Sequence, residues 1–162
     1  SLENKYIHDP MTGLFNRRGF YQRVQPLFEQ CVKTNTPFVL VSADLNGLKT
    51  INDTYGHADG DIAISTVGQA LAQESSASAT CARFGGDEFI LLLRNTTAEE
   101  AVQAAQALLT TVDNDYQVTK SIGIALYPQS ADNYEALLSR ADEALYQAKR
   151  TKNTYAVSDT HC

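Results

Sequence analysis

Three acidic residues stand where the sequence predicts strand ends or turns, and they are the first candidates for chemistry. The stretch RFGGDEF places Asp87 and Glu88 directly after two glycines and before the apolar run FILLL. Asp44 follows a second apolar run, FVLVSA, which it is expected to close. Aspartate is depleted in strands, so turn chemistry accounts for the glycines but leaves the acids unexplained.

Carboxylates that converge at one edge of a sheet repel one another unless a cation lies between them. If the first strand lies beside the hairpin strands, Asp44 and Asp87 come together at such an edge. Mg²⁺ suits this position because it takes oxygen ligands and keeps substrate phosphates in its coordination shell. Two such ions roughly 3.5–4 Å apart can activate a hydroxyl and stabilise a leaving pyrophosphate. The pattern indicates phosphoryl or nucleotidyl transfer, and the alternative is a plain hairpin turn with solvated acids.

The segment DLNGLKTINDTYGHADGD, which begins at Asp44, adds candidates for nucleotide binding. Its glycines permit a close approach of the backbone to phosphates. Asn52 and Asp61 offer a donor, an acceptor and a carboxylate. A carboxylate that faces the two N–H groups of guanine selects that base over adenine. The alternative is that Asn52 forms an Asx-turn and Asp61 caps a helix.

The elements that must position these residues alternate between helices and strands. A helix is expected to open at Asn16, with Pro26 as a kink or boundary within it. The twin glycines 85 and 86 predict a hairpin, and Thr97 with Glu100 predicts a capping box. This order favours an α/β or α+β domain in which helices pack on a sheet. The expected strands are 38–43, 81–84, 88–93, 117–127 and 155–157, and the expected helices are 16–31, part of 46–61, 61–74, 97–112 and 134–148.

Composition limits the classes of function. The 162 residues suit one domain with one core. A formal net charge of -6 argues against a nucleic-acid partner but allows a phosphorylated small molecule whose charge a cation balances. Three cysteines without a pair spacing predict neither disulfides nor zinc, which indicates a cytoplasmic setting. No stretch has membrane-spanning length, so any inner-membrane tether is expected outside this chain.

Beyond these residue-level patterns, the chain resembles the GGDEF family of diguanylate cyclases. The resemblance is carried by RFGGDEF and DLNGLKTINDTYGHADGD, with DPMTGLFNRRGF, VTKSIGIALYP and SRADEALYQAKR in the same order. It implies a nucleotidyl-cyclase fold, similar to the polymerase palm, with a central, mostly antiparallel sheet flanked by helices. It also implies condensation of two GTP molecules into cyclic di-GMP, with release of two pyrophosphates, between two copies of the domain that face each other across a two-fold axis.

The resemblance implies a role for each matching residue. Asp44, the backbone carbonyl of Leu45 and Asp87 match the metal ligands, with Mg²⁺ as the expected ion and Mn²⁺ as a second candidate. Asp87 also matches the catalytic base, and Glu88 matches a second required acid. The residues that match substrate contacts are Gly85 and Gly86 at the turn, Asn52 and Asp61 for guanine, His57 nearby, and Lys49 and Lys149 for phosphates. Taken singly, each lysine is also compatible with a solvated surface charge, and His57 with a turn histidine.

The sequence departs from the family pattern at three places. Ser76 and Ala79 stand where an inhibitory RxxD motif often carries Arg and Asp, so no product inhibition is expected there. Asn46 replaces an aspartate that many members carry, which removes one charge near the metals. The ending AKRTKN lacks the usual glycine and arginine, which leaves no firm phosphate role for Lys152.

The expected organisation is one domain with short flanks, and two rival functions accompany it. Residues 1–8 are expected to connect to an absent N-terminal sensor domain, residues 9–157 to form the cyclase domain, and residues 158–162 to form a tail. One rival is a module of the same fold that binds GTP as a sensor without turnover. The other is a cyclase that makes a mixed cyclic dinucleotide, against which Asp61 argues.

Overall fold

A five-stranded sheet forms the centre of the computed structural model, which describes residues 6–74, 79–111, 119–151 and 155–158. The strand order is β2-β3-β1-β4-β5. All neighbouring strands pair antiparallel except β4 and β5, which pair in parallel, so the expected mostly antiparallel sheet is confirmed. The strands are β1 (Phe38–Asn46), β2 (Ala79–Gly85), β3 (Glu88–Arg94), β4 (Thr119–Tyr127) and β5 (Tyr155–Val157).

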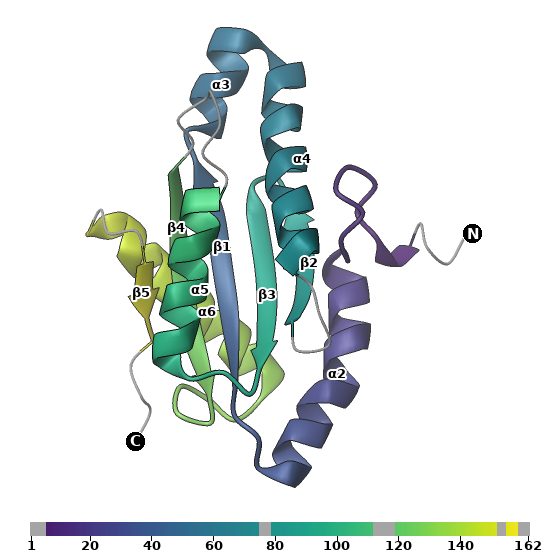
Figure 1. Cartoon of the computed structure of the whole chain (residues 1–162), viewed down its shortest axis with the longest axis vertical. Helices are drawn as coiled ribbons and strands as arrows, with labels where there is room; N and C mark the ends of the chain where they lie inside the picture. The colour runs from purple at the N-terminus through teal and green to yellow at the C-terminus, as the bar shows by residue number, and fades with distance from the viewer. Residues whose placement is uncertain (1–5, 75–78, 112–118, 152–154, 159–162) are drawn as a thin grey trace.

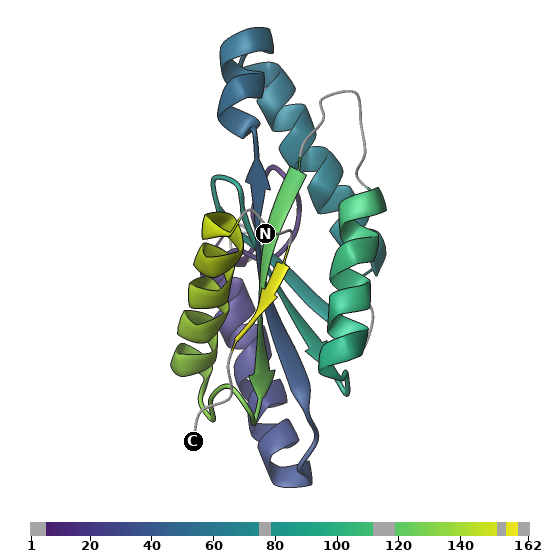
Figure 2. The ribbon, with the colours of Figure 1, turned by 90° about the vertical axis from the view of Figure 1, so that its left-hand side faces the viewer.

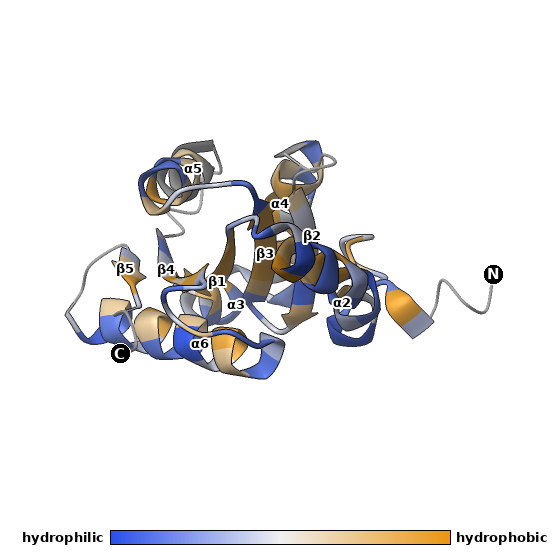
Figure 3. Ribbon diagram, turned by 90° about the horizontal axis from the view of Figure 1, so that it is seen from below, coloured by the Kyte–Doolittle hydropathy of each residue, from blue (hydrophilic) through white to orange (hydrophobic). Residues whose placement is uncertain are grey.

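Helices cover both faces of this sheet. Figure 3 shows α4 (His57–Glu74) and α5 (Ala98–Thr111) on one face, and α2 (Arg17–Thr34) and α6 (Tyr134–Arg150) on the other. The short helix α3 (Leu48–Tyr55) follows β1 and, with the start of α4, extends beyond the end of the sheet (Figure 1). The molecule is therefore a three-layer α/β domain.

Alternation along β1 divides the core in two. Val39 and Val41 pack under α4 and α5, whereas Phe38 and Leu40 pack under α2 and α6. Successive side chains of a strand point to opposite faces, so a strand with a helical layer on each side buries both sets. All four residues are at most 2% exposed. This explains why β1 is a continuous apolar run in the sequence.

Two predicted helix starts are confirmed in atomic detail. The Asn16 side chain accepts a hydrogen bond from the Gly19 N–H at 2.8 Å and caps α2. Thr97 and Glu100 form the reciprocal capping box of α5. The prediction of a boundary at Pro26 is wrong, because α2 continues through it to Thr34.

Two boundaries near the candidate site also differ from the prediction. Asp44 does not close its strand, because β1 is paired on both sides and the ladder continues to Asn46. The helix expected from Asp61 begins at His57, directly after Gly56, whose φ of 98° ends α3 and turns the chain. The expected start of a strand at Gln117 lies outside the described residues, and β4 is described from Thr119.

In the part of the chain that the structure describes, no helix combines the length and the hydropathy needed to cross a membrane. Seen from the side, the carboxyl-terminal end of β1, the β2–β3 turn and the carboxyl-terminal end of α6 lie at neighbouring heights (Figure 2). This end of the sheet holds the acids discussed below.

Candidate active site

The strand register brings the candidate acids together. Asp44 of β1 is the direct partner of Glu88 of β3 in the antiparallel ladder. The N–H of Leu45 donates to the carbonyl of Asp87 at 3.2 Å, so Asp87 lies beside the same segment. Side chains of directly opposed residues emerge on one side of a sheet, about 4.5–5.5 Å apart at Cβ. The charge of Asp44 acts on Asp87, so the expected convergence of these two acids is confirmed, and we call Asp44, Asp87 and Glu88 the carboxylate edge.

The turn before Asp87 requires glycine at two positions. Gly85 has a φ of 140° and Gly86 a φ of 51°, both in the region that side chains rarely adopt. No atom lies within 4 Å of the place where a Cβ would stand on either residue, so the backbone conformation, not crowding, selects glycine. The turn thereby presents open backbone beside the acids.

One arginine, Arg83, holds this turn in place through hydrogen bonds to its backbone. Arg83 donates from Nε and Nη2 to the carbonyl oxygen of Gly86, at 3.1 and 2.9 Å. Its Nη1 forms an ion pair with Asp9 Oδ1 at 2.9 Å, and both side chains are largely buried. The other carboxylate oxygen of Asp9 accepts hydrogen bonds from the N–H and hydroxyl of Thr12. The turn is thus tied to a second, distant turn of the chain.

The helix α6 adds a cation and a further acid to the carboxylate edge. Lys149 Nζ lies 2.5 Å from Asp44 Oδ2. Asp142 accepts a hydrogen bond from the hydroxyl of the buried Ser42 at 2.9 Å. These groups surround a cavity of about 250 Å³, which is lined by Asp44, Glu88, Asp142, Leu145, Tyr146 and Lys149.

The sequence-based prediction missed Asp142. Asp142, Tyr146 and Lys149 are spaced by four and three residues, so they share one face of α6. That spacing was visible in SRADEALYQAKR, but it does not reveal which face of the helix points to the acids. Only the packing of α6 on β1 brings Asp142 to Ser42.

Burial and mutual repulsion raise the pKa values of two acids in this group. Burial raises the pKa of Asp87 above its ordinary value, and the charge of Asp44 adds to the effect, while Lys149 and Arg83 oppose it. Burial likewise raises the pKa of Glu88, reinforced by Asp142 and Asp44. Acids that resist ionisation because other acids lie close are stabilised by a bound cation.

The donor set fits a hard divalent ion. The carboxylates of Asp44 and Asp87, with the carbonyl of Leu45, supply only oxygen atoms, which are the ligands that Mg²⁺ and Mn²⁺ prefer. Among the described residues, however, no three acidic, histidine or cysteine side chains are already gathered closely enough to hold a metal. The expected set has only two side-chain ligands and a backbone carbonyl, and the chemistry of these oxygen atoms suits the ion.

The predicted nucleotide contacts form a separate group on α3 and α4. Lys49 and Asn52 lie on α3, and His57 and Asp61 lie one turn apart at the start of α4. Lys49, His57 and Asp61 are exposed, whereas Asn52 is partly buried. No hydrogen bond or ion pair in the described structure joins these residues to the carboxylate edge. Lys149, by contrast, is placed directly at that edge.

Gly60 explains how Asn52 fits between the two helices. A Cβ on Gly60 would lie 1.8 Å from Asn52 Oδ1, so only glycine leaves room for that amide. The Oδ1 atom is buried and accepts no hydrogen bond from the described residues. A buried amide oxygen without a donor is costly, which is consistent with a site that a ligand completes.

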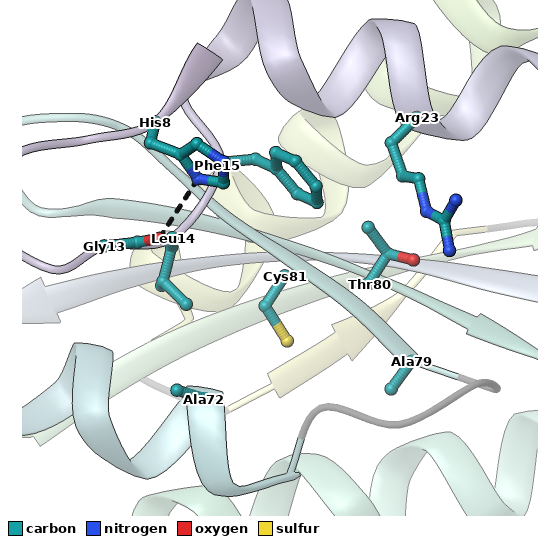
Figure 4. A pocket seen from close by; sticks show the side chains of 9 residues that line it. All are labelled: His8, Gly13, Leu14, Phe15, Arg23, Ala72, Ala79, Thr80 and Cys81. Carbon is teal, nitrogen blue, oxygen red and sulfur yellow. Dashed lines mark hydrogen bonds between the residues drawn. The ribbon is translucent and has the colours of Figure 1, made fainter. Parts of the chain in front are cut away.

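A second cavity lies away from the acids. It has about 450 Å³ and is formed by the segment from His8 to Phe15, by α2, by the end of α4 and by β2. Figure 4 shows His8 and Arg23 at opposite ends of it. Ala79, one of the two positions that differ from the inhibitory motif, lines this cavity, whereas Ser76 lies outside the described residues.

A mixed sheet with helices on both faces and acids at one edge is the fold of a nucleotidyl-cyclase domain. Residues 6–154 match the family model described as "Diguanylate cyclase, GGDEF domain". The chain therefore belongs to the GGDEF family.

Individual relatives agree with this assignment. The chain is 35% identical over 150 residues to the bifunctional diguanylate cyclase/cyclic di-GMP phosphodiesterase MucR of Pseudomonas aeruginosa. This match covers 88% of the chain and 22% of MucR. It is 37% identical over 156 residues to the probable diguanylate cyclase DgcC of Escherichia coli. This match covers 92% of the chain and 42% of DgcC. The chain thus spans less than half the length of these relatives.

A solved structure shows the same fold. The GGDEF domain of TpbB, also called YfiN, from Pseudomonas aeruginosa superimposes with a TM-score of 0.87 at 31% sequence identity. The match covers 94% of each chain. The architecture derived above is therefore that of an experimentally determined GGDEF domain.

Proposed function

We propose that this domain is a diguanylate cyclase that condenses two GTP molecules into cyclic di-GMP and releases two pyrophosphates. The observation that carries the proposal is the register that opposes Asp44 to Glu88 beside Asp87. It occurs in a GGDEF family chain whose signature keeps both glycines and both acids. A module that only binds GTP would not need this full set of carboxylates.

The reaction assigns distinct roles to the acids. Asp87 accepts the proton of the ribose hydroxyl of one GTP as its oxygen bonds to the α-phosphorus of the other. The bond between that phosphorus and the bridging oxygen to the β-phosphate breaks, and pyrophosphate leaves. Asp44, Asp87 and the carbonyl of Leu45 would hold Mg²⁺, or Mn²⁺ as a second candidate, which supplies positive charge against the phosphates. Glu88 is a second required acid.

The nucleotide is bound by the remaining predicted residues. Asn52 and Asp61 contact guanine, His57 lies nearby, and the turn at Gly85 and Gly86 lets the backbone approach the nucleotide. Lys49 and Lys149 neutralise phosphates. The unpartnered Asn52 Oδ1 supports this assignment, because guanine carries N–H donors for such an acceptor.

Turnover needs two copies, since each copy of the 9–157 domain holds one GTP and the two face each other about a two-fold axis. A sensor domain would set that arrangement in the cytoplasm. Most of the two expected flanks, residues 1–5 and 159–162, lie outside the described residues. The partners are thus GTP, a second copy and the sensor, and not nucleic acid.

The test is product formation from GTP and Mg²⁺, followed by chromatography and mass spectrometry. The domain is assayed over a range of concentrations and also fused to a dimerising coiled coil, with the Asp87→Asn variant in the same fusion as control. Cyclic di-GMP from the wild-type fusion alone supports the proposal. GTP that is bound but left intact by the fusion would instead identify a sensor module.

Base choice is tested with GTP, ATP and an equal mixture. Asp61 predicts that the mixture yields cyclic di-GMP, and that Asp61→Ser weakens the preference for GTP by about tenfold, while Mn²⁺ binding stays unchanged. An excess of mixed cyclic dinucleotide from the wild type would overturn the assignment of guanine selection. Competition by ATP that is the same in both proteins would show that Asp61 does not read the base.

Product inhibition is not expected at the position of the inhibitory motif. None of the described residues that line the cavity beside Ala79 is acidic, so a carboxylate that could accept guanine N–H groups is absent from its described wall. Titration of cyclic di-GMP into the domain should show no low-micromolar site that persists when GTP fills the active site. Such a site would refute this expectation.

A further inference from the structure

Lys149 occupies a position that a phosphate contact does not explain. Its Nζ lies directly on Asp44 Oδ2, and the Asp44 side chain is only 16% exposed, against 40% for Lys149. A divalent ion held by Asp44 would draw on the negative charge of the same carboxylate. The ammonium group and such an ion would therefore compete for one carboxylate.

We propose that Lys149 is the internal counter-ion of the metal-free site, which holds Asp44 until a divalent cation takes over that carboxylate. Lys149 is then free to turn toward the substrate phosphates. The inference rests on the proposed function, because it takes Asp44 as a metal ligand. It extends that function because it sets an order of binding. The metal ion binds first, and the ammonium group of Lys149 is then available for the nucleotide.

The backbone around Lys149 is fixed, so the exchange needs only a side-chain rotation. Asp142 anchors α6 to β1 through the hydroxyl of Ser42. Gly123 of β4 lets α6 lie directly on the sheet, because a Cβ there would come within 2.2 Å of the Ala141 carbonyl oxygen and the Leu145 nitrogen. The helix cannot shift without breaking this packing, whereas the long, partly exposed lysine side chain can rotate.

The other acids at this edge do not have such a partner. Within the described residues, neither Asp87 nor Glu88 takes part in an ion pair, and the ion pair of Asp44 is made by Lys149. A cation that binds Asp44 must therefore compete with Lys149 for this carboxylate.

Removal of Lys149 has opposite effects on two measurable properties. It frees Asp44 for a cation, so nucleotide-free metal affinity rises. It also leaves Asp44 without its direct counter-charge, so the metal-free domain loses stability. A lysine that served phosphates alone would change neither property beyond the effect of one lost surface charge.

The experiment titrates the nucleotide-free domain with Mn²⁺ alone and measures free Mn²⁺ by electron paramagnetic resonance. Lys149→Gln should bind Mn²⁺ about three- to fivefold more tightly than wild type. Arg150→Gln is the matched control, because it removes the same charge one residue along α6 without a contact to Asp44, and it should stay within about 1.5-fold. Lys149→Arg, which keeps a cation on Asp44, should bind no more tightly than wild type.

The outcomes separate this inference from the proposed function. If Lys149→Gln binds Mn²⁺ with the same affinity as Arg150→Gln, while Asp44→Asn loses Mn²⁺ binding, the counter-ion role is overturned and the metal site is retained. Mn²⁺ binding that is unchanged in Asp44→Asn refutes the metal assignment itself. Thermal unfolding in chelator gives a second readout: Lys149→Gln should melt below Arg150→Gln, and equal melting temperatures would count against the counter-ion.

Discussion

The carboxylate edge and the α3–α4 hairpin are built in opposite ways. The edge consists of side chains on paired strands, fixed by the β1–β3 ladder and by Arg83 beneath the turn. The predicted base-contacting residues lie on two short helical ends that extend beyond the sheet (Figure 1). There the side chains of His57 and Asp61 are exposed. The proposed function thus assigns the reaction chemistry to paired strands and nucleotide selection to a projecting hairpin.

This difference matches the demands of the two tasks. Groups that act on the reacting atoms must be held within a fraction of an ångström, which a paired strand achieves better than a loop. Groups that recognise a base must let the nucleotide in and out, and exposed helical ends allow this. Changes at the edge should therefore act on turnover, and changes on the hairpin on substrate affinity.

The largest expected effect is the loss of turnover in Asp87→Asn. The amide cannot accept the proton of the attacking hydroxyl and is a poor metal ligand, so the rate should fall by at least about a thousandfold. The variant should fold normally, because Asp87 lies half-buried in the turn and is not part of the hydrophobic core. Product chromatography measures the rate, and circular dichroism checks the fold. Activity within tenfold of wild type would place the base elsewhere.

Arg83→Ala should be the most destabilising change near the edge. It removes two hydrogen bonds to the Gly86 carbonyl and leaves Asp9 as a largely buried charge without its partner. We expect a loss of about 3 kcal/mol in the free energy of unfolding, measured with urea. Asp9→Asn keeps the contacts to Gly86 and should lose only about 1 kcal/mol. Equal losses in the two variants would mean that the turn contacts contribute nothing.

Gly60→Ala tests the hairpin half of the comparison. The new methyl group would collide with Asn52 Oδ1 and displace that amide. KM for GTP should rise about tenfold, with kcat changed by less than about threefold. Asn52→Ala is the matched variant, and the double variant should be no worse than either single one if both act through the same contact. Additive losses would show that Gly60 acts independently of Asn52.

The pH dependence of the free energy of unfolding tests the electrostatics of the carboxylate edge. Because the folded pKa values of Asp87 and Glu88 are raised, the folded metal-free domain holds protons that the unfolded chain releases. Their contribution is fully present below the unfolded pKa values and is lost as pH rises through the folded ones. The free energy of unfolding in chelator should therefore fall just above the ordinary carboxylate range. Asp87→Asn should flatten this fall, and a rise over the same interval would contradict the argument.

The smallest effect is expected at the exposed pair of Arg140 and Glu143 on α6, which no hydrogen bond or ion pair among the described residues joins to the carboxylate edge. The two side chains are 44% and 64% exposed and 3.3 Å apart. Glu143→Gln should change stability by less than about 0.5 kcal/mol and leave turnover unchanged. A larger change in either would show that α6 transmits surface charge to the edge.

The sequence predicted the parts of the fold that depend on short-range signals. The apolar runs, the Asn16 cap, the capping box at Thr97 and the glycine turn each encode an element locally, and each element is present. The convergence of Asp44 with Asp87 could be expected because the GGDEF signature and the last residues of the first strand lie at the same end of the sheet. Glycine spacing also indicated the α3–α4 region, although not its second helix start.

What could not be predicted depends on contacts between distant segments. The role of Ser42 in holding Asp142 joins residues 100 positions apart, and no local pattern encodes it. The lysine on Asp44 was expected to face phosphates, and its position follows from how α6 packs on Gly123. The continuation of β1 past Asp44 likewise follows from its pairing with β4, which continues to Asn46 and which no local pattern in β1 encodes.

The shared guanidinium of Arg83 has a mechanical consequence. The same guanidinium group donates a hydrogen bond to the Gly86 carbonyl in the signature turn and forms an ion pair with Asp9 in the first turn of the domain. A force that displaces the opening turn by an ångström must either stretch these bonds or drag the signature loop along. Tension applied at the start of the fold is thus delivered within two contacts to the backbone that carries Asp87.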